Sequence, residues 1–221
     1  MNKTMETKLK LLLIVLITTS AFGQKNELKI AEKAIKSQEY SKAITAITAA
    51  ESLIANMDNK TIAKFYFLKV QAYNGKKDFQ TAAKTLDDLL KIEEQIGKKK
   101  YSIQANVIKN EMVQELFKLA NSQYRTKEYK NASTNFYLVY KLNPLDTTFI
   151  YNAAISASLA KEYDLSLKYF KELQEIEYTG ISTLYYATNK KTGIKEDLGS
   201  KQNRDLRVKI GLYKDPINEN T

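Results

Sequence analysis

Cysteine and histidine are both absent from this sequence, and their absence removes much of the side-chain chemistry that enzymes use. Without thiols the chain forms no disulfide, iron–sulfur cluster or thiolate zinc site. Without imidazole it has no catalytic triad or dyad that uses histidine as the base. No Gly-rich phosphate loop and no metal-ligand spacing is present. We therefore expect a protein that is not an enzyme and takes no cofactor or metal.

Glycine and proline are scarce as well, at 7 and 2 residues. Glycine costs backbone entropy in a helix and proline removes a hydrogen-bond donor, so their scarcity favours helices. A β-sandwich of this length needs many more turn residues. Since 43% of the residues are hydrophobic, the chain can form a packed core, and we expect helical structure around it.

Acidic residues are outnumbered by basic ones, 25 against 35, which gives a formal net charge of +10. A basic excess can attract nucleic acid or acidic membrane surfaces. Here the lysines are scattered among glutamates along helical stretches, and no compact basic patch with interleaved aromatics is present. We expect no nucleic-acid partner, and we interpret the run Lys98-Lys99-Lys100 as a solvated loop.

The only long apolar run lies near the N-terminus, at residues 11–17. Lysines precede it, and the small residues Ala21 and Gly23 follow it. This is the layout of a secretory signal peptide, and the run is far shorter than the ~20 residues needed to span a bilayer. We predict that residues 1–23 are removed after Gly23. The mature protein would then be periplasmic or secreted, without stable membrane insertion.

Four later segments share one local pattern: an aromatic residue, two further residues, a small residue and its neighbour. The pattern starts at Tyr40, Phe79, Tyr129 and Tyr163. Apolar residues four and seven positions past the small residue follow it, which is the spacing of one face of an amphipathic helix. A second helical stripe lies upstream of each segment, so each unit is predicted to be a helix, a tight turn and a helix.

These units resemble tetratricopeptide repeats, a helix–turn–helix motif of 34 residues. The step from Ala132 to Ser166 is 34 residues, whereas the two earlier steps are 39 and 50. We attribute the longer steps to extended helices or linkers, the larger around residues 97–112. In the third unit the family's consensus residue types stand at Leu119, Ala120, Tyr129, Ala132, Phe136 and Pro144.

The resemblance implies an all-α fold, a right-handed superhelical array of antiparallel helix pairs, over residues 24–180. The repeats would occupy residues 24–57, 63–96, 113–146 and 147–180. The stretch between Asn152 and Asn189 is also similar to exported repeat proteins of Bacteroidetes-type Gram-negative bacteria, in which further repeats usually follow.

A different pattern begins after residue 180. Residues 183–188 and 194–198 are short and alternating, with a turn-like segment between them, so we predict a small β-hairpin. Ser200 is placed to cap a short helix that ends near Ile210. Hairpin and helix together occupy residues 181–213, and the polar residues 214–221 are predicted to be a flexible tail.

The tetratricopeptide resemblance also implies a binding surface, because the first helix of each pair lines the concave side of such arrays. Aromatic, amide and arginine side chains at those positions are typical of surfaces that bind a protein or peptide. An aromatic at helical spacing can equally belong to the core. The candidate residues are Lys64, Phe67, Gln71, Asn74, Gln114, Phe117, Asn121, Tyr124, Arg125, Tyr151, Ile155 and Ser158.

Three functions compete for this sequence. The leading hypothesis is a non-catalytic scaffold of the cell envelope or secreted space, which binds a protein partner through its repeats. The first alternative is an assembly subunit that self-associates through the exposed apolar face of its last repeat helix, at Leu167, Phe170, Leu173 and Ile176. The second is a carboxylate-dependent enzyme without a recognisable motif.

The signal peptide generates a direct prediction: protein isolated from its native host begins at or near Gln24. Mass spectrometry of the intact protein measures this start. A protein that begins at Met1 in the cytoplasmic fraction would contradict both the cleavage and the localisation.

Overall fold

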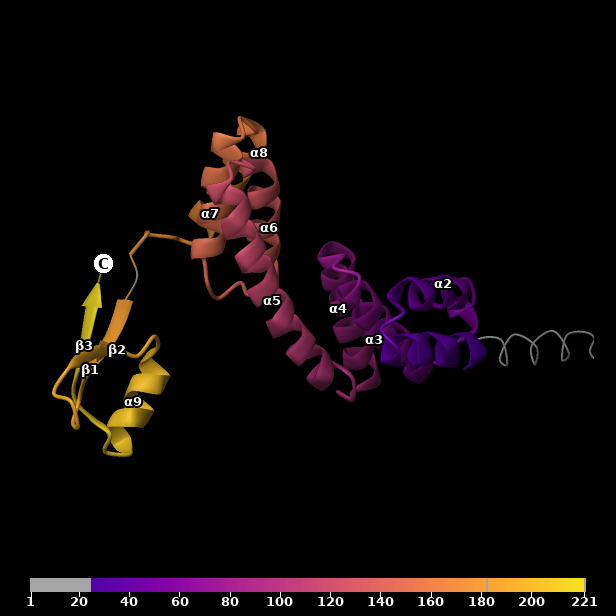
Figure 1. Cartoon of the computed structure of the whole chain (residues 1–221), viewed down its shortest axis with the longest axis horizontal. Coiled ribbons are helices and arrows are strands. Elements are labelled where there is room, and N and C mark those ends of the chain that lie inside the picture. The colour runs from indigo at the N-terminus through magenta and orange to yellow at the C-terminus, as the bar shows by residue number, and fades with distance from the viewer. Residues whose placement is uncertain (1–24, 182, 221) are drawn as a thin grey trace, which may run out of the picture. The chain divides into compact units, whose positions relative to one another are not determined.

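The computed structural model describes residues 25–181 and 183–220 and is mostly helical, with a small antiparallel sheet near the C-terminus (Figure 1). The predicted signal peptide lies outside the described residues. Among the described residues, none of the helices combines the length and the apolar character that a membrane-spanning segment requires. After a first helix at residues 25–36, the elements are α2 (Tyr40–Glu51), η1 (Ile54–Asn56), α3 (Asn59–Gly75), α4 (Phe79–Ile96), α5 (Ser102–Arg125), α6 (Tyr129–Leu142), α7 (Thr148–Leu159), α8 (Tyr163–Glu175), β1 (Thr183–Asn189), β2 (Lys195–Asp197), α9 (Lys201–Lys209) and β3 (Tyr213–Asn220).

The chain forms two compact units, and the division falls inside α8, after Ser166. The N-terminal unit contains the helices up to the first turn of α8. The C-terminal unit contains the rest of α8, the three strands and α9. The sequence analysis predicted that the repeats end at residue 180, whereas the division between the two compact units lies before that residue, after Ser166.

The turns inside the helix pairs share one backbone conformation. In the turn between α5 and α6, Lys127 N donates to Tyr124 O (3.2 Å) and Glu128 N donates to Gln123 O (2.8 Å). This is the Schellman motif, in which a residue in the left-handed conformation ends the helix. The left-handed residue is Gln38, Lys77, Lys127 and Lys161 in the four turns, always two positions before the aromatic that begins the next helix.

Small residues allow the paired helices to approach closely, as expected. Ala43, Ala82 and Ala132, which follow the turn aromatics, are fully buried. Ser166 takes the same place in α8, and its hydroxyl donates to Ala154 O of α7 at 2.9 Å. Because this hydroxyl has a partner across the turn, serine replaces alanine without leaving a buried polar atom unsatisfied.

An aromatic residue of a turn also packs between successive helix pairs. Tyr40, at the start of α2, lies against the last residue of α3, where a Cβ added to Gly75 would come within 2.1 Å of the Tyr40 ring. Only glycine leaves room for the ring at this position. The first pair of helices and the second are therefore fitted together at the end of α3.

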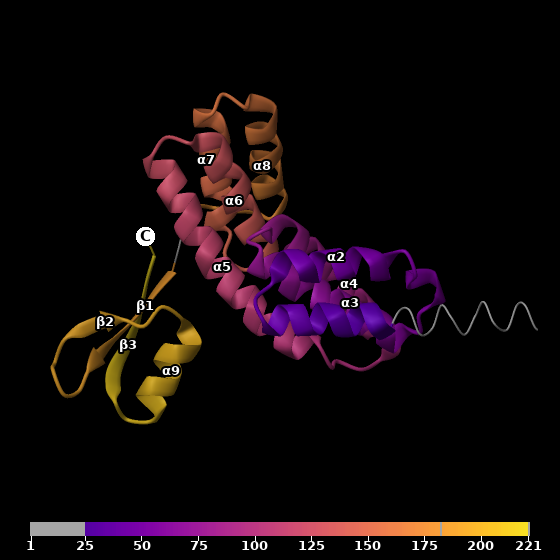
Figure 2. The ribbon, with the colours of Figure 1, turned by 45° about the vertical axis from the view of Figure 1, so that its right-hand side comes forward.

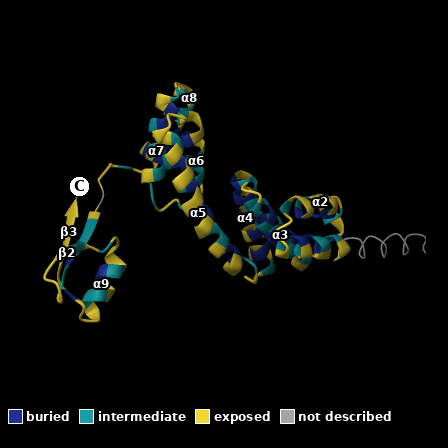
Figure 3. Ribbon diagram, in the orientation of Figure 1, coloured by how far each residue is buried: buried dark blue, intermediate teal, exposed yellow. Residues whose placement is uncertain are grey.

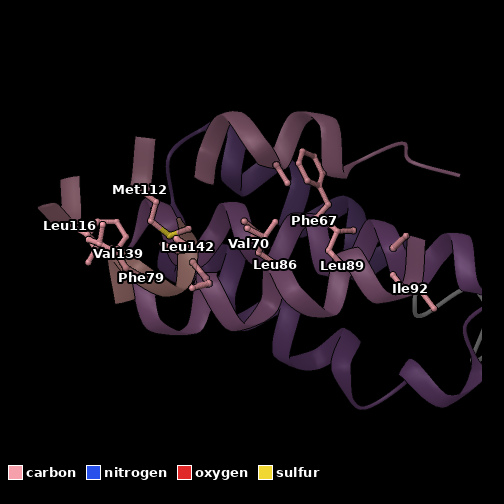
Figure 4. Close-up of a cluster of buried hydrophobic side chains, with 14 residues drawn as sticks. Phe67, Val70, Phe79, Leu86, Leu89, Ile92, Met112, Leu116, Val139 and Leu142 are labelled. Carbon is pink, nitrogen blue, oxygen red and sulfur yellow. The ribbon is translucent and has the colours of Figure 1, made fainter. Parts of the chain in front are cut away.

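The main core of the N-terminal unit lies between α3, α4, α5 and α6. Figure 4 shows Phe67, Leu86 and Leu89 within this cluster. A second cluster joins the first helix, α2 and α3. Buried residues follow one face of each of these helices and exposed residues the other (Figure 3), which is the amphipathic pattern expected from the sequence.

Helix α5 joins the two ends of this unit. Its N-terminal part contacts α3 and α4, and its C-terminal part packs against α6, as both ribbon views show (Figures 1 and 2). It has 24 residues, and α4 before it has 18. These two extended helices account for the long step between the second and third sequence patterns.

In the C-terminal unit β1 pairs with β2, as the predicted hairpin required, and α9 begins after Ser200, whose hydroxyl accepts from Asn203 N at 3.2 Å. The prediction of a flexible tail after residue 213 was wrong over residues 214–220. These residues belong to β3, which pairs along β1 in the sheet order β2-β1-β3.

Two features explain how so polar a segment forms an edge strand. Backbone hydrogen bonds to β1 do not depend on apolar side chains, and a bulge places Asp215 and Pro216 opposite Ala187. Asp215 takes a left-handed φ of 52° there, and a bulge on an edge strand is where proline is tolerated. The buried Arg204 of α9 adds a hydrogen bond to Ile217 O at 3.3 Å.

The shared turn conformation leads to a prediction about stability. Lys127 has a φ of 65°, which costs a side-chain-bearing residue about 1 kcal/mol and glycine very little. We expect Lys127→Gly to raise the free energy of unfolding by about 0.5–1 kcal/mol, measured by urea denaturation. The matched control is Lys118→Gly inside α5, which should lower it by about 1 kcal/mol. A loss of stability in both variants would contradict the assigned turn.

Candidate functional site

The predicted binding residues lie on three helices of the N-terminal unit. Lys64 to Asn74 are on α3, Gln114 to Arg125 on α5, and Tyr151 to Ser158 on α7. These are the first helices of the second, third and fourth pairs. The structure exposes some of the candidates and buries others, and the difference follows from the neighbours of each helix.

Phe67 is not available at the surface. It is 8% exposed and stacks on the ring of Tyr101, with 5.1 Å between ring centroids. Tyr101 stands at the start of the extended α5, next to α3. Because the Tyr101 ring covers it, Phe67 belongs to the core, which is the alternative that the sequence left open for each candidate aromatic, and it does not contribute to the surface.

Phe117 is half-buried and also has a packing role. Its ring meets the edge of Phe149, at 5.5 Å between centroids, and so joins α5 to the first turn of α7. Tyr124 is 39% exposed and meets the Tyr129 ring edge-on at 5.4 Å. Tyr151 is 40% exposed. Tyr124 and Tyr151 are therefore the aromatic candidates that reach solvent.

Lys64 is committed to an ion pair. Its ammonium lies 2.7 Å from Glu32 Oε2 on the first helix, and both side chains are about one third exposed. The hydrogen bond from Lys64, against the opposing effect of burial, keeps the pKa of Glu32 below its usual value. This ion pair links the first helices of two successive helix pairs. Gln71 and Asn74 follow Lys64 along α3 and are half-buried.

The second half of α5 carries the most accessible polar candidates. Gln114 and Arg125 are exposed, and Asn121 is half-buried, one turn before Arg125. Within the described chain, neither Asn121 nor Arg125 forms a side-chain hydrogen bond or ion pair. Their donors and acceptors are therefore free for a partner, beside the exposed ring of Tyr124. On α7, Ser158 is exposed and Ile155 half-buried.

Sequence reasoning missed Glu93, a charged residue in the interior of the N-terminal unit. Its carboxylate, on α4, is 2% exposed. It accepts from the backbone N–H groups of Lys100 (2.9 Å), Tyr101 (2.6 Å) and Ser102 (3.0 Å) at the start of α5. Glu93 thus caps the N-terminus of α5 from a neighbouring helix, where the helix dipole favours a negative charge.

The surroundings of Glu93 determine its protonation. Burial alone would raise the pKa of the carboxyl, but the polar groups of Ser102 and the backbone N–H groups of Tyr101 and Lys100 that surround it outweigh burial and lower the pKa. The carboxylate therefore stays ionised at neutral pH. A glutamate on an otherwise apolar helix face, a few residues before a glycine and the next helix, is the only sequence signal that could have indicated it.

In the described part of the chain, no cluster of three or more acidic side chains is arranged to hold a metal ion. No protein-family model and no curated protein matches the sequence. The candidate site is thus a surface of polar and aromatic side chains on α5 and α7, with a buried glutamate that fixes where α5 begins.

The buried cap generates a prediction with a definite pH dependence. A carboxyl whose pKa is lowered by folding stabilises the fold above its unfolded pKa, about 4.3, and loses that contribution as the pH falls through the lower folded value. We expect Glu93→Gln to lower the free energy of unfolding by about 1–3 kcal/mol at pH 7. The deficit relative to the wild type should shrink below about pH 4.

Denaturant unfolding between pH 7 and pH 3 measures this difference. The matched control is Glu94→Gln, the exposed neighbour on the same helix, which should change stability by less than about 0.5 kcal/mol. Equal effects of the two substitutions would show that the cap contributes nothing to stability.

Proposed function

We propose that this chain is a non-catalytic scaffold of the tetratricopeptide kind, whose helix pairs stack into a right-handed superhelix and bind a protein partner. Four helix pairs with the same Schellman turn support the repeat character. Neighbouring first helices meet in succession: the first helix meets α3 through Glu32 and Lys64, and α3 contacts α5. Such adjacency lines one face of an array with first helices.

The single observation that carries the binding proposal is the accessible, unpaired polar surface on α5. Asn121 and Arg125 have no partner among the described residues, and Tyr124 lies beside them with 39% of its surface exposed. Tyrosine and arginine are enriched among the residues that dominate binding energy in protein interfaces. We define Asn121, Tyr124 and Arg125 as the α5 triad and propose it as the centre of the binding surface.

We further propose that the scaffold acts outside the cytoplasm, since its first residues have the layout of a signal peptide. The rival function is self-assembly through the last repeat helix. Leu167, Phe170 and Ile176 of the C-terminal unit are exposed, which favours this rival as a second candidate.

Affinity capture with matched variants tests the binding proposal. The full-length chain is immobilised, and the proteins retained from an envelope extract of the host are quantified by mass spectrometry and then titrated one by one. Replacing the α5 triad by alanine should weaken binding of the specific partner by at least about tenfold. Lys84→Ala combined with Lys91→Ala, on the exposed face of α4, is the control and should leave binding unchanged.

A partner that binds both variants equally well would overturn the α5 triad as the binding centre. Light scattering of the purified chain at two concentrations addresses the rival function. The scaffold proposal expects a monomer at both. An oligomer that dissociates when Leu167 and Phe170 are replaced by serine would favour self-assembly.

A further inference from the structure

A second site lies away from the α5 triad, at the opposite end of the N-terminal unit. A pocket of about 400 Å³ opens between the first turns of α3, the end of α4 and the connection to α5. Four lysines line it, Lys60 and Lys64 from α3 and Lys98 and Lys100 from the connection. Sequence analysis treated the lysines of this connection as a solvated loop, yet here they face a cavity together with two more from α3.

The two carboxylates in the pocket wall are already engaged. Asp58 caps α3, with its oxygens accepting from Thr61 N (2.9 Å) and from Thr61 Oγ1 (3.1 Å). Glu93 caps α5 with both of its oxygens. Neither carboxylate lies within ion-pair distance of a lysine side chain of the pocket. They reduce the positive charge of the pocket without neutralising it.

The four lysine side chains differ in whether they already have an interaction partner. Lys64 pairs with Glu32 at 2.7 Å, and Lys100 Nζ lies 4.8 Å from the centroid of the Tyr101 ring. The side chains of Lys60 and Lys98 form no hydrogen bond, salt bridge or ring contact with another described residue, although the charge of Lys60 helps to lower the pKa of the nearby Asp58 carboxyl. These two ammonium groups, one from each side of the pocket, are the donors left for an anion. The positive end of the α3 dipole adds to their attraction.

The rest of the wall is apolar. Ala63, Ile96 and the ring of Tyr101 line it beside the lysines, and Tyr101 is held in place by its stacking on Phe67. An apolar wall with a few convergent polar groups is typical of pockets for organic ligands rather than for bare inorganic ions. Inorganic phosphate would meet the lysines but leave this wall in contact with water.

We propose that this pocket binds a small amphipathic organic anion, whose charged group lies between Lys60 and Lys98 and whose apolar body covers Ile96 and Tyr101. A sulfonate or a phosphate ester on an aromatic ring has this chemistry. The site does not depend on the proposed scaffold function, because the α5 triad contributes nothing to it. Lys64 already has a carboxylate partner and is not needed as a donor.

Fluorescence titration of the full-length chain with 1-anilinonaphthalene-8-sulfonate tests the proposal, since this probe brightens when its rings leave water. Lys60→Gln combined with Lys98→Gln should weaken binding of the probe by roughly tenfold, because two charges near the anion are removed. Lys84→Gln combined with Lys91→Gln is the matched control. It removes the same charge from the exposed face of α4 and should change the affinity by less than about twofold.

Two further measurements make the test specific. Lys60→Arg combined with Lys98→Arg keeps both charges and should bind the probe like the wild type. The ester 1-naphthyl phosphate should displace the probe, and inorganic phosphate at the same concentration should not. Equal affinities of the two Gln variants would place the probe elsewhere and overturn the proposal. Displacement by inorganic phosphate as effective as by the ester would also overturn it, since the apolar wall would then play no part.

Discussion

The arrangement of the N-terminal unit depends on one interaction, the hydrogen bonding of the Glu93 carboxylate to the backbone at the start of α5. Between α4 and α5 the chain passes through three consecutive lysines, whose mutual repulsion and solvation would favour an open loop. One buried anion accepts three successive backbone N–H groups there and so fixes the residue at which α5 begins. An uncapped N-terminus of α5 would leave those donors unsatisfied next to the main core.

The start of α5 in turn determines what the neighbouring helices can display. Because α5 begins at Ser102, Tyr101 lies over α3 and stacks on Phe67. The same helix extends 24 residues and carries Asn121, Tyr124 and Arg125 at its far end. One helix therefore buries a predicted binding residue at its beginning and presents others near its end. The buried cap and the accessible α5 triad are connected through a single rigid element.

Much of the local structure could be predicted from the sequence, since it depends on local rules. Apolar spacing, small residues after an aromatic and scarce glycine predicted the helix pairs, and alternation predicted the β1–β2 hairpin. What depended on distant partners was missed. β3 is polar and forms because β1 offers a backbone edge, with Pro216 placed in a bulge. Phe67 is buried by Tyr101, which comes from the next helix pair. Glu93 accepts hydrogen bonds from backbone groups at the start of another helix.

The lysines of the α4–α5 connection show why position in the fold matters more than a run of charge. In sequence, three lysines in a loop are ordinary solvated residues. Glu93 binds the backbone of this loop rather than its ammonium groups, so it orders the connection without neutralising the lysine side chains. Lys98 and Lys100 are thereby held opposite Lys60 and Lys64, beside Ile96 and Tyr101. A cap that stabilises the fold through the backbone donors of this connection thus leaves the ammonium group of Lys98, in the same connection, available for a ligand.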